Sequence, residues 1–302
     1  MNKRPTFSLP PRVSARPPSW VVAFSLIEVL VVIALLSLII IGLVAMFSQT
    51  QRAWKLGTTQ VDIGESGRAV TDMLTRELSQ IRPSYVSNGV NFYVELAHAE
   101  PFKQELPGNP LPGRTNLLEE LYFLTQENQA WTAIGYVVLT NHPGTTIWER
   151  PLAGVGSLYR YSGKAPYGVS PSLLYNTATN SYFRTAFTNL SHIVDNVVHF
   201  KVRAYDTSGT WVTNSVFTNT FVWPVDLARF AAGEAEFYQF SNNIVPASVE
   251  LELGILEDRA AERARSISDT AARAKFLAQQ AGKVHIFRWR VPVRNVDPTA
   301  YQ

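Results

Sequence analysis

An apolar segment near the N-terminus constrains the fold of this chain more than any other feature. Residues Val29 to Phe47 carry no charged side chain, and only Ser37 and Gly42 interrupt their apolar character. A run of about 19 apolar residues is long enough to cross the hydrocarbon core of a bilayer as a helix. A helix on the surface of a soluble domain would show a polar stripe, which this segment lacks. We therefore expect a membrane-spanning helix over residues 24–47.

A single acidic residue stands at the start of this span. Glu28 comes directly after Phe24-Ser25-Leu26-Ile27 and directly before the uncharged run. An unpaired charge inside a membrane helix costs about 3 kcal/mol or more, so a carboxylate kept there is expected to have a partner and a function.

The segment before the span is basic and rich in proline. Residues 1–23 contain four cationic side chains, five prolines and no acidic residue. Prolines at this density prevent a continuous helix, so we interpret residues 1–23 as a leader peptide rather than as part of the fold. Positive charge before an apolar span predicts that this side is cytoplasmic and that the C-terminal bulk lies outside the cytoplasm. The whole chain has a formal net charge of +3, and without the four leader cations it has −1, which argues against a nucleic-acid-binding domain.

The eight residues Ala23-Phe24-Ser25-Leu26-Ile27-Glu28-Val29-Leu30 resemble the cleavage and methylation site of type IV pilins and the related pseudopilins. The resemblance implies cleavage after Ala23 by a prepilin peptidase and N-methylation of Phe24. It also implies that Glu28 neutralises the N-terminal amine of a neighbouring subunit, and pairing offsets the cost of both charges in lipid. The family usually has glycine at the position of Ala23.

The helix is expected to continue beyond the membrane as an amphipathic segment over residues 48–83. An apolar seam recurs there at intervals of three or four residues, formed by Val70, Met73, Leu74, Leu78 and Ile81. Glycines at positions 57, 64 and 67 each weaken a helix by about 1 kcal/mol relative to alanine, which predicts bending or melting over residues 57–67. Pro83 is expected to end the helix.

Residues 84–302 read as a β-rich domain with a late helix. Alternating or apolar runs predict strands at residues 92–96, 120–125, 134–140, 146–150, 158–161, 193–205, 217–223, 249–255 and 285–293. Loops are expected at 101–116 and 162–181, a short helix at 226–237 capped by Asp226, and one exposed helix near 257–281. The fold class is therefore α+β: a long N-terminal helix packed on an antiparallel sheet. This order resembles a pilin head, and more loosely the large minor pseudopilin that caps type II secretion filaments.

No motif in the chain identifies an enzyme. Cysteine is absent, which excludes disulfides and thiolate chemistry. His98 with Glu100 could hold a metal ion, but a solvated histidine is the simpler interpretation. The cluster of His192, Asp195 and His199 is likewise interpreted as structural or solvated rather than catalytic. We expect no cofactor, no metal and no catalytic residue.

Other polar and aromatic residues have plain structural interpretations. Asp206 is expected to form a turn rather than a calcium site, because one carboxylate is too few for that ion. The charged residues of 257–265 are expected to be a solvated helix face, with a partner-docking surface as the alternative. The tryptophans and tyrosines in the strand patterns are expected in the core, and an exposed Trp211 would revive a sugar- or DNA-binding interpretation.

The leading hypothesis is a non-enzymatic minor pilin or pseudopilin. It would span the bacterial inner membrane once, be processed at Ala23 and Phe24, and assemble through Glu28 and its helix with other subunits at or near a filament tip. Its partners would be the membrane, prepilin peptidase and other pilin subunits. Binding to nucleic acid is not expected. The first alternative is a signal-anchored periplasmic domain that binds a protein, sugar or DNA. The second is an extracytoplasmic hydrolase that uses His192, Asp195 or His199.

Overall fold

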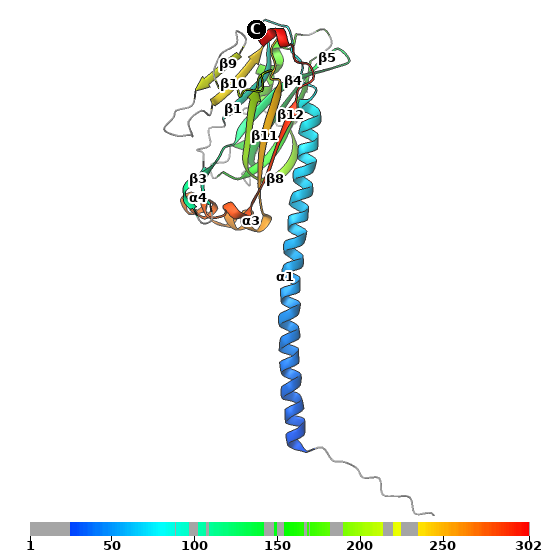
Figure 1. The fold of residues 1–302 in the computed structure, drawn as a ribbon, viewed down its shortest axis with the longest axis vertical. Helices are drawn as coiled ribbons and strands as arrows, with labels where there is room; N and C mark the ends of the chain where they lie inside the picture. Colours follow the sequence, from blue (N-terminus) through cyan, green and yellow to red (C-terminus); the bar gives the residue numbers. More distant parts are fainter. Residues whose placement is uncertain are drawn as a thin grey trace, which may run out of the picture. The chain divides into compact units, whose positions relative to one another are not determined.

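The computed structural model describes residues 25–87, 89–96, 102–106, 109–141, 148–149, 154–165, 168, 170–181, 190–213, 220–224 and 235–301. The chain forms two compact units, residues 1–56 and residues 57–302. The second unit is called the head below, and its strands and helices are labelled in Figure 1. The expected α+β class is confirmed, because a long helix and an antiparallel sheet make up most of the described residues.

The N-terminal helix α1 runs from Leu26 to Leu78, a length of 53 residues. Of the bending or melting expected over residues 57–67, the melting is wrong, because all of these residues are α-helical. The helix also ends earlier than Pro83. Ile81 forms an isolated β-bridge with Thr125, and the N–H of Arg82 donates to the carbonyl oxygen of Leu124. The chain therefore leaves the helix to pair with the sheet before the proline is reached.

One antiparallel sheet of ten strands forms the body of the head. Its order is β12-β11-β8-β7-β5-β4-β1-β10-β9, with β6 paired to β5. The strands in chain order are β1 (Val90–Leu96), β4 (Glu119–Glu127), β5 (Ala130–Asn141), β6 (Trp148–Glu149), β7 (Gly156–Lys164), β8 (Leu190–Tyr205), β9 (Thr220–Pro224), β10 (Ala235–Ser241), β11 (Ser248–Leu256) and β12 (Val284–Pro292). Each strand pair is antiparallel.

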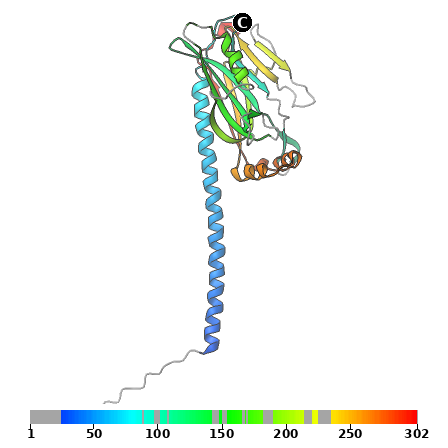
Figure 2. The same cartoon turned by 180° about the vertical axis from the view of Figure 1, so that it is seen from behind.

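The remaining elements are short. A two-stranded sheet is formed by β2 (Phe102–Leu106) and β3 (Asn109–Asn116). The helices are α2 (Ser172–Ser181), α3 (Asp258–Ser266) and α4 (Thr270–Ala278), followed by the 3-10 turns η1 (Ala281–Lys283) and η2 (Pro298–Tyr301). Seen from behind in Figure 2, α3 and α4 lie at one end of the head and the C-terminus lies at the other.

The strand predictions locate every described strand of the large sheet except β10, with shifts of a few residues at the ends. Two loop predictions are wrong, because residues 101–116 contain β2 and β3 and residues 162–181 contain the end of β7 and all of α2. The late helix is two helices. It breaks at 267–269, where Asp269 caps α4 by accepting from the N–H of Ala272. Most of the expected helix at 226–237 lies outside the described residues, but its last three residues belong to β10.

Three apolar clusters hold the head together. The largest lies between α1 and the sheet, and it includes Leu74 and Leu78 of the helix together with Phe123 and Phe200 of the strands. A second cluster, which contains Tyr122 and Tyr161, packs under α2 on β4, β5 and β7. A third is formed by three alanines of α3 with Leu277 of α4. Of the apolar seam predicted for α1, Val70, Leu74 and Leu78 are buried in the first cluster.

Helix α1 crosses the sheet from its edge toward its middle. At Gly67 the helix backbone touches the Phe287 ring of β12, so closely that a Cβ atom at this position would overlap the ring. Ten residues later, Glu77 accepts hydrogen bonds from Tyr136 Oη of β5 (2.5 Å) and from Arg160 Nε of β7 (2.9 Å). Arg160 Nη2 also lies 2.9 Å from Glu77 Oε1, and a bidentate contact of arginine with carboxylate has fixed geometry. It therefore sets the position of the end of α1 on the central strands.

Candidate functional site

The apolar part of α1 is not covered by any of the described residues. Among the described residues, this is the one helix long and apolar enough to cross a membrane, with a mean hydropathy of 3.2 over its most apolar window, none of which is buried. Leu38, for example, is 70% exposed. An exposed apolar surface of this length is unfavourable in water, so lipid or other protein must cover it. A membrane span or a signal anchor fits this segment.

Glu28 lies in the first turn of α1. Its backbone N–H contacts both the hydroxyl and the carbonyl oxygen of Ser25, at 3.3 and 3.0 Å, so Ser25 caps the start of the helix. The Glu28 residue is exposed, and no ion pair to its carboxylate is found in the part of the chain that the structure describes. Ala23 and Phe24, the residues of the expected cleavage and methylation, lie outside the described residues.

The histidine cluster predicted from the sequence is only partly assembled. His192 Nε2 lies 3.0 Å from Asp195 Oδ1 on the surface of β8, and the same oxygen accepts from Ser157 Oγ at 2.5 Å. The carboxylate therefore lies between the serine and the histidine, whereas a nucleophilic triad needs the histidine in the middle. In the described ranges no group of three or more potential ligands could hold a metal ion. His98 and Glu100 lie outside those ranges.

His199 lies elsewhere, inside the head. It is 4% exposed, and its Nδ1 accepts from the N–H of Leu117 at 3.0 Å. Its Nε2 lies 3.5 Å from Glu252 Oε2. Burial lowers the pKa of His199, and hydrogen bonding by His199 is the main cause that lowers the pKa of Glu252 to about 2. The ring is therefore a neutral link between β8, β11 and the segment before β4, and the structural interpretation is supported.

Asp206 forms a turn as predicted. Its Oδ1 accepts from the backbone N–H groups of Ser208 and Thr210 and from the Ser208 hydroxyl. Among the aromatics, Tyr136 and Tyr161 are buried, whereas Trp211 is half-buried with its indole N–H donating to Tyr238. The side chains of Trp148 and Trp223 lie outside the described part. Core packing therefore accounts for most of the aromatics that can be examined.

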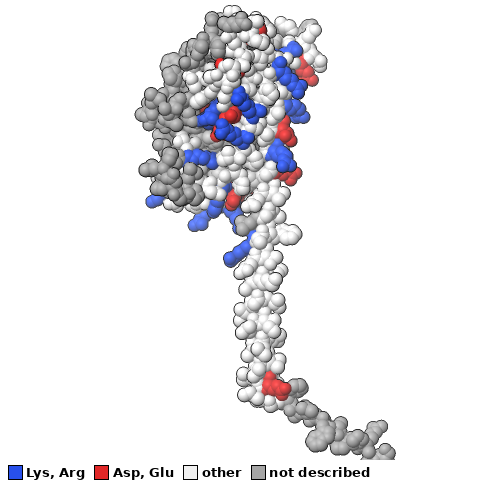
Figure 3. All heavy atoms as spheres, viewed as in Figure 1, with Lys and Arg blue, Asp and Glu red and all other residues white. Residues whose placement is uncertain are grey.

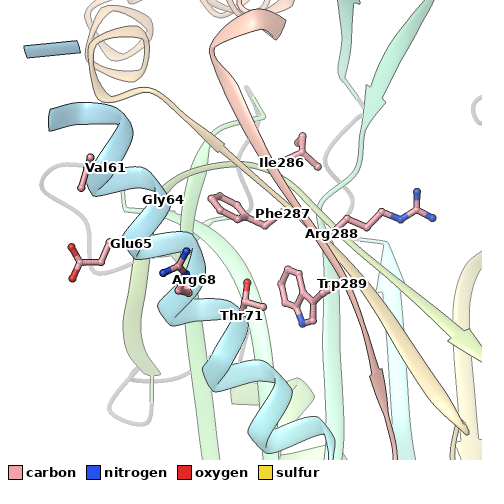
Figure 4. Close-up of a pocket in the computed structure, with 9 residues that line it drawn as sticks. All are labelled: Val61, Gly64, Glu65, Arg68, Thr71, Ile286, Phe287, Arg288 and Trp289. Atoms are coloured by element: carbon pink, nitrogen blue, oxygen red, sulfur yellow. The ribbon is translucent and has the colours of Figure 1, made fainter. Parts of the chain in front are cut away.

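A groove lies between α1 and the edge strand β12 of the head. It has a volume of about 950 Å³. Five residues of α1 between Val61 and Thr71 form one wall, and four consecutive residues of β12, Ile286–Trp289, form the other. Figure 4 shows Phe287 and Trp289 on the helix side of the strand, with Arg68 on the facing side of α1. Both aromatic rings are only half-buried.

The opposite face of the same strands is charged. Glu250 and Glu252 of β11 lie between cations of the neighbouring strands, with Arg288 Nη2 2.8 Å and Arg203 Nη1 3.3 Å from Glu250 Oε1. Arg290 lies over the ring of Tyr205. In Figure 3 blue and red side chains gather together over this part of the sheet. Among the described residues named here, three arginines stand beside two glutamates, so this group has a positive net charge.

Sequence reasoning missed the groove. The alternation in residues 285–293 predicts a strand, and the seam of α1 predicts a packed helix, but neither pattern tells which strand stands at the edge of the sheet. The one local signal was Gly67, which was interpreted as a weak point of the helix and is instead the point of close approach to Phe287.

Comparison of the chain with models of protein families, with curated proteins and with solved structures finds no match.

Proposed function

We propose that this protein is a structural, non-enzymatic subunit of the type IV pilin and pseudopilin class. In this proposal a prepilin peptidase cleaves after Ala23, and Phe24 becomes the methylated N-terminus. The apolar part of α1 lies in the bacterial inner membrane, and the head lies in the periplasm. The chain then joins a filament through its helix, at or near the tip.

One observation carries the proposal: a fully exposed apolar helix that begins with a lone carboxylate. Residues 29–47 offer lipid or a neighbouring helix an uncharged surface, and Glu28 stands at its start. Helices gain little from hydrophobicity when they associate inside lipid, so polar contacts and close packing must set their register. Pairing of Glu28 with the amine of the adjacent subunit supplies such a contact. The motif around Ala23 supplies that amine.

The head supports the proposal at a coarser level. A long helix whose second part packs on an antiparallel sheet is the architecture expected for this class, and α1 packs on the sheet through buried residues between Ile63 and Leu78. A minor, tip-proximal role is proposed from the size of the head and its loose sequence likeness to capping subunits.

Mass spectrometry of the protein purified from its native membrane tests the processing step. We expect a mature N-terminus at Phe24 with one added methyl group. An intact leader would contradict the proposal and would favour the signal-anchored binding domain.

Substitution of Glu28 tests the assembly step. We expect Glu28→Leu to abolish incorporation into the filament while leaving membrane insertion intact, because the span becomes more apolar but loses its polar contact. Glu28→Asp is the matched control, since it keeps a carboxylate and should retain part of the incorporation. Wild-type levels of Glu28→Leu in filaments isolated by shearing would contradict the mechanism.

A further inference from the structure

Strand β12 stands at the edge of the large sheet, and β11 is its only strand neighbour in the described part of the chain. The nine-residue pairing of these two strands runs from Ser248 opposite Pro292 to Leu256 opposite Val284. The outer side of β12 therefore faces the open end of the sheet. An edge of this kind is a template for another strand.

The pairing register tells which backbone groups face outward. At one end the N–H of Glu257 donates to the carbonyl of Lys283, and at the other the N–H of Val293 donates to the carbonyl of Ala247. Residues of an antiparallel strand alternate between bonding their neighbour and pointing away from it. His285, Phe287, Trp289 and Val291 therefore bond to β11, and the backbone groups of Val284, Ile286, Arg288 and Arg290 point outward.

We propose that β12 is a docking strand for a partner protein, which adds an extended segment to the sheet edge with alternating apolar and acidic residues. The proposal concerns the head and does not depend on cleavage of the leader or on assembly through α1.

The apolar residues of the docking segment are inferred from the groove between α1 and β12. A strand added beside β12 alternates its side chains between the two faces of the sheet. On the face toward α1 they enter the groove of about 950 Å³, next to the half-buried rings of Phe287 and Trp289. The exposed side chain of Val61 adds apolar surface to the far wall. The buried indole nitrogen of Trp289 has no hydrogen-bond acceptor among the described residues, which leave this polar group of the wall unsatisfied.

The acidic residues of the docking segment are inferred from the charged side chains on the opposite face of the sheet. There the incoming side chains lie beside Arg288 and Arg290, both of which are exposed. Opposite charges across neighbouring strands are favourable, and like charges directly opposite each other are unfavourable. A second copy of β12 sets arginine against arginine in every register that places Arg288 or Arg290 opposite one of these two residues, so the edge disfavours those self-pairings. Carboxylates of a different protein meet no such repulsion.

The C-terminal end of the edge is closed, which limits the length of the added strand. Pro292 has no N–H to offer, and the N–H of Arg294 donates to the carbonyl of Ser79 at the end of α1. The open edge therefore extends from Val284 to Arg290. A docking segment pairs with these seven residues and ends where α1 returns to the sheet.

The test uses the full chain in detergent micelles and three fluorescent ten-residue peptides as probes. One alternates valine and glutamate, one alternates valine and lysine, and the third is the valine–glutamate peptide with every second amide N-methylated. Methylation removes the backbone N–H donors along one edge of the peptide and leaves its charge unchanged. We expect the unmethylated valine–glutamate peptide to bind at least about tenfold more tightly than either of the others.

Two variants of one position isolate the backbone contact. Ile286→Pro removes an outward N–H but no bond to β11, and Ile286→Ala removes the same side chain while keeping the N–H. We expect Ile286→Pro to weaken binding about tenfold and Ile286→Ala to change it by less than about twofold. Thermal unfolding of each variant shows whether the head is folded. If Ile286→Pro does not fold, the comparison of the methylated with the unmethylated peptide on the natural chain still tests the backbone contact.

A third variant tests the charge. Arg290→Glu should weaken the binding of the valine–glutamate peptide and strengthen the binding of the valine–lysine peptide. Equal binding of the methylated and unmethylated peptides would overturn strand addition. Equal binding of the acidic and basic peptides would overturn the acidic partner, and no binding of any probe up to about 1 mM would overturn the docking strand altogether.

Discussion

The two parts of helix α1 share one backbone conformation and differ in everything that surrounds them. Leu38, in the first part, is 70% exposed, whereas Leu74, in the second, is fully buried against the sheet. The first part has no apolar contact from the rest of the described chain, and the second contributes to the largest core of the head. The same residue type in the same secondary structure therefore has a partner inside the molecule in one case and needs an external one in the other.

This difference separates stability from assembly. Most of the stability of a helix in a protein comes from the packing of its apolar face, not from its intrinsic propensity. The part of α1 from residue 57 onward obtains that packing from the sheet, so its side chains should control unfolding of the head. The part before residue 57 can obtain it only from lipid or from other subunits, so its side chains should control insertion and assembly.

Truncation of one leucine in each part gives the largest contrast. Leu74→Ala should lower the free energy of unfolding of the head by about 2–5 kcal/mol, because it leaves a cavity in the core. Leu38→Ala should change it by less than about 0.5 kcal/mol. Denaturant unfolding of the full chain in detergent, followed by tryptophan fluorescence of the head, measures both. Equal losses would show that the two parts form one cooperative unit.

Alanine substitution of two glycines three residues apart gives a smaller contrast. A Cβ atom at Gly67 overlaps the ring of Phe287, whereas one at Gly64 meets no atom within 4 Å. Gly67→Ala should therefore cost about 1–3 kcal/mol from overpacking, offset in part by the better helix propensity of alanine, and Gly64→Ala should stabilise by up to about 1 kcal/mol.

The double variant Gly67→Ala with Phe287→Leu serves as the control for the glycine pair. It should recover part of the loss if the ring is the obstacle. Stabilisation by Gly67→Ala alone, measured in the same unfolding experiment, would show that the helix does not approach β12 as closely as described.

Acidification should affect the head and leave the apolar part of α1 unchanged. The pKa of buried His199 is lowered from 6.5, so below pH 6.5 the unfolded chain takes up a proton that the folded head excludes. The stability that depends on the neutral ring is thus present above pH 6.5 and declines as the pH falls below it. Glu252, with a pKa lowered to about 2, adds a further decline between pH 4.5 and 2.

The variant His199→Asn keeps a hydrogen-bond acceptor near Leu117 and removes the titrating ring. Unfolding free energies measured from pH 7 to pH 5.5 should fall for the natural chain and stay flatter for this variant. The same slope in both would assign the pH dependence to other groups. Residues 29–47 contain no titratable side chain, so their helix content should not change.

Helices and strands with a regular hydrophobic period could be predicted from the sequence. Where they end and what they contact was harder to predict. The alternation of Phe200, Val202 and Ala204 correctly indicates a strand, because the side-chain period of two is a local property. The end of α1 at Leu78 depends on the pairing of Ile81 with Thr125, which lies 44 residues further along the chain. The separation of His199 from His192 depends on which neighbours β8 acquires along its length.

The sequence by itself determined the apolar span, the position of Glu28, the α+β class and most strands of the sheet, because each is recorded in residues that are close together in the chain. Only the tertiary structure decided that β12 stands at an edge, that Gly67 admits Phe287, and that a groove lies beside the helix. The physical reason is that strand order and helix placement arise from contacts between distant segments. No local period of hydrophobicity encodes which segment becomes the neighbour of which.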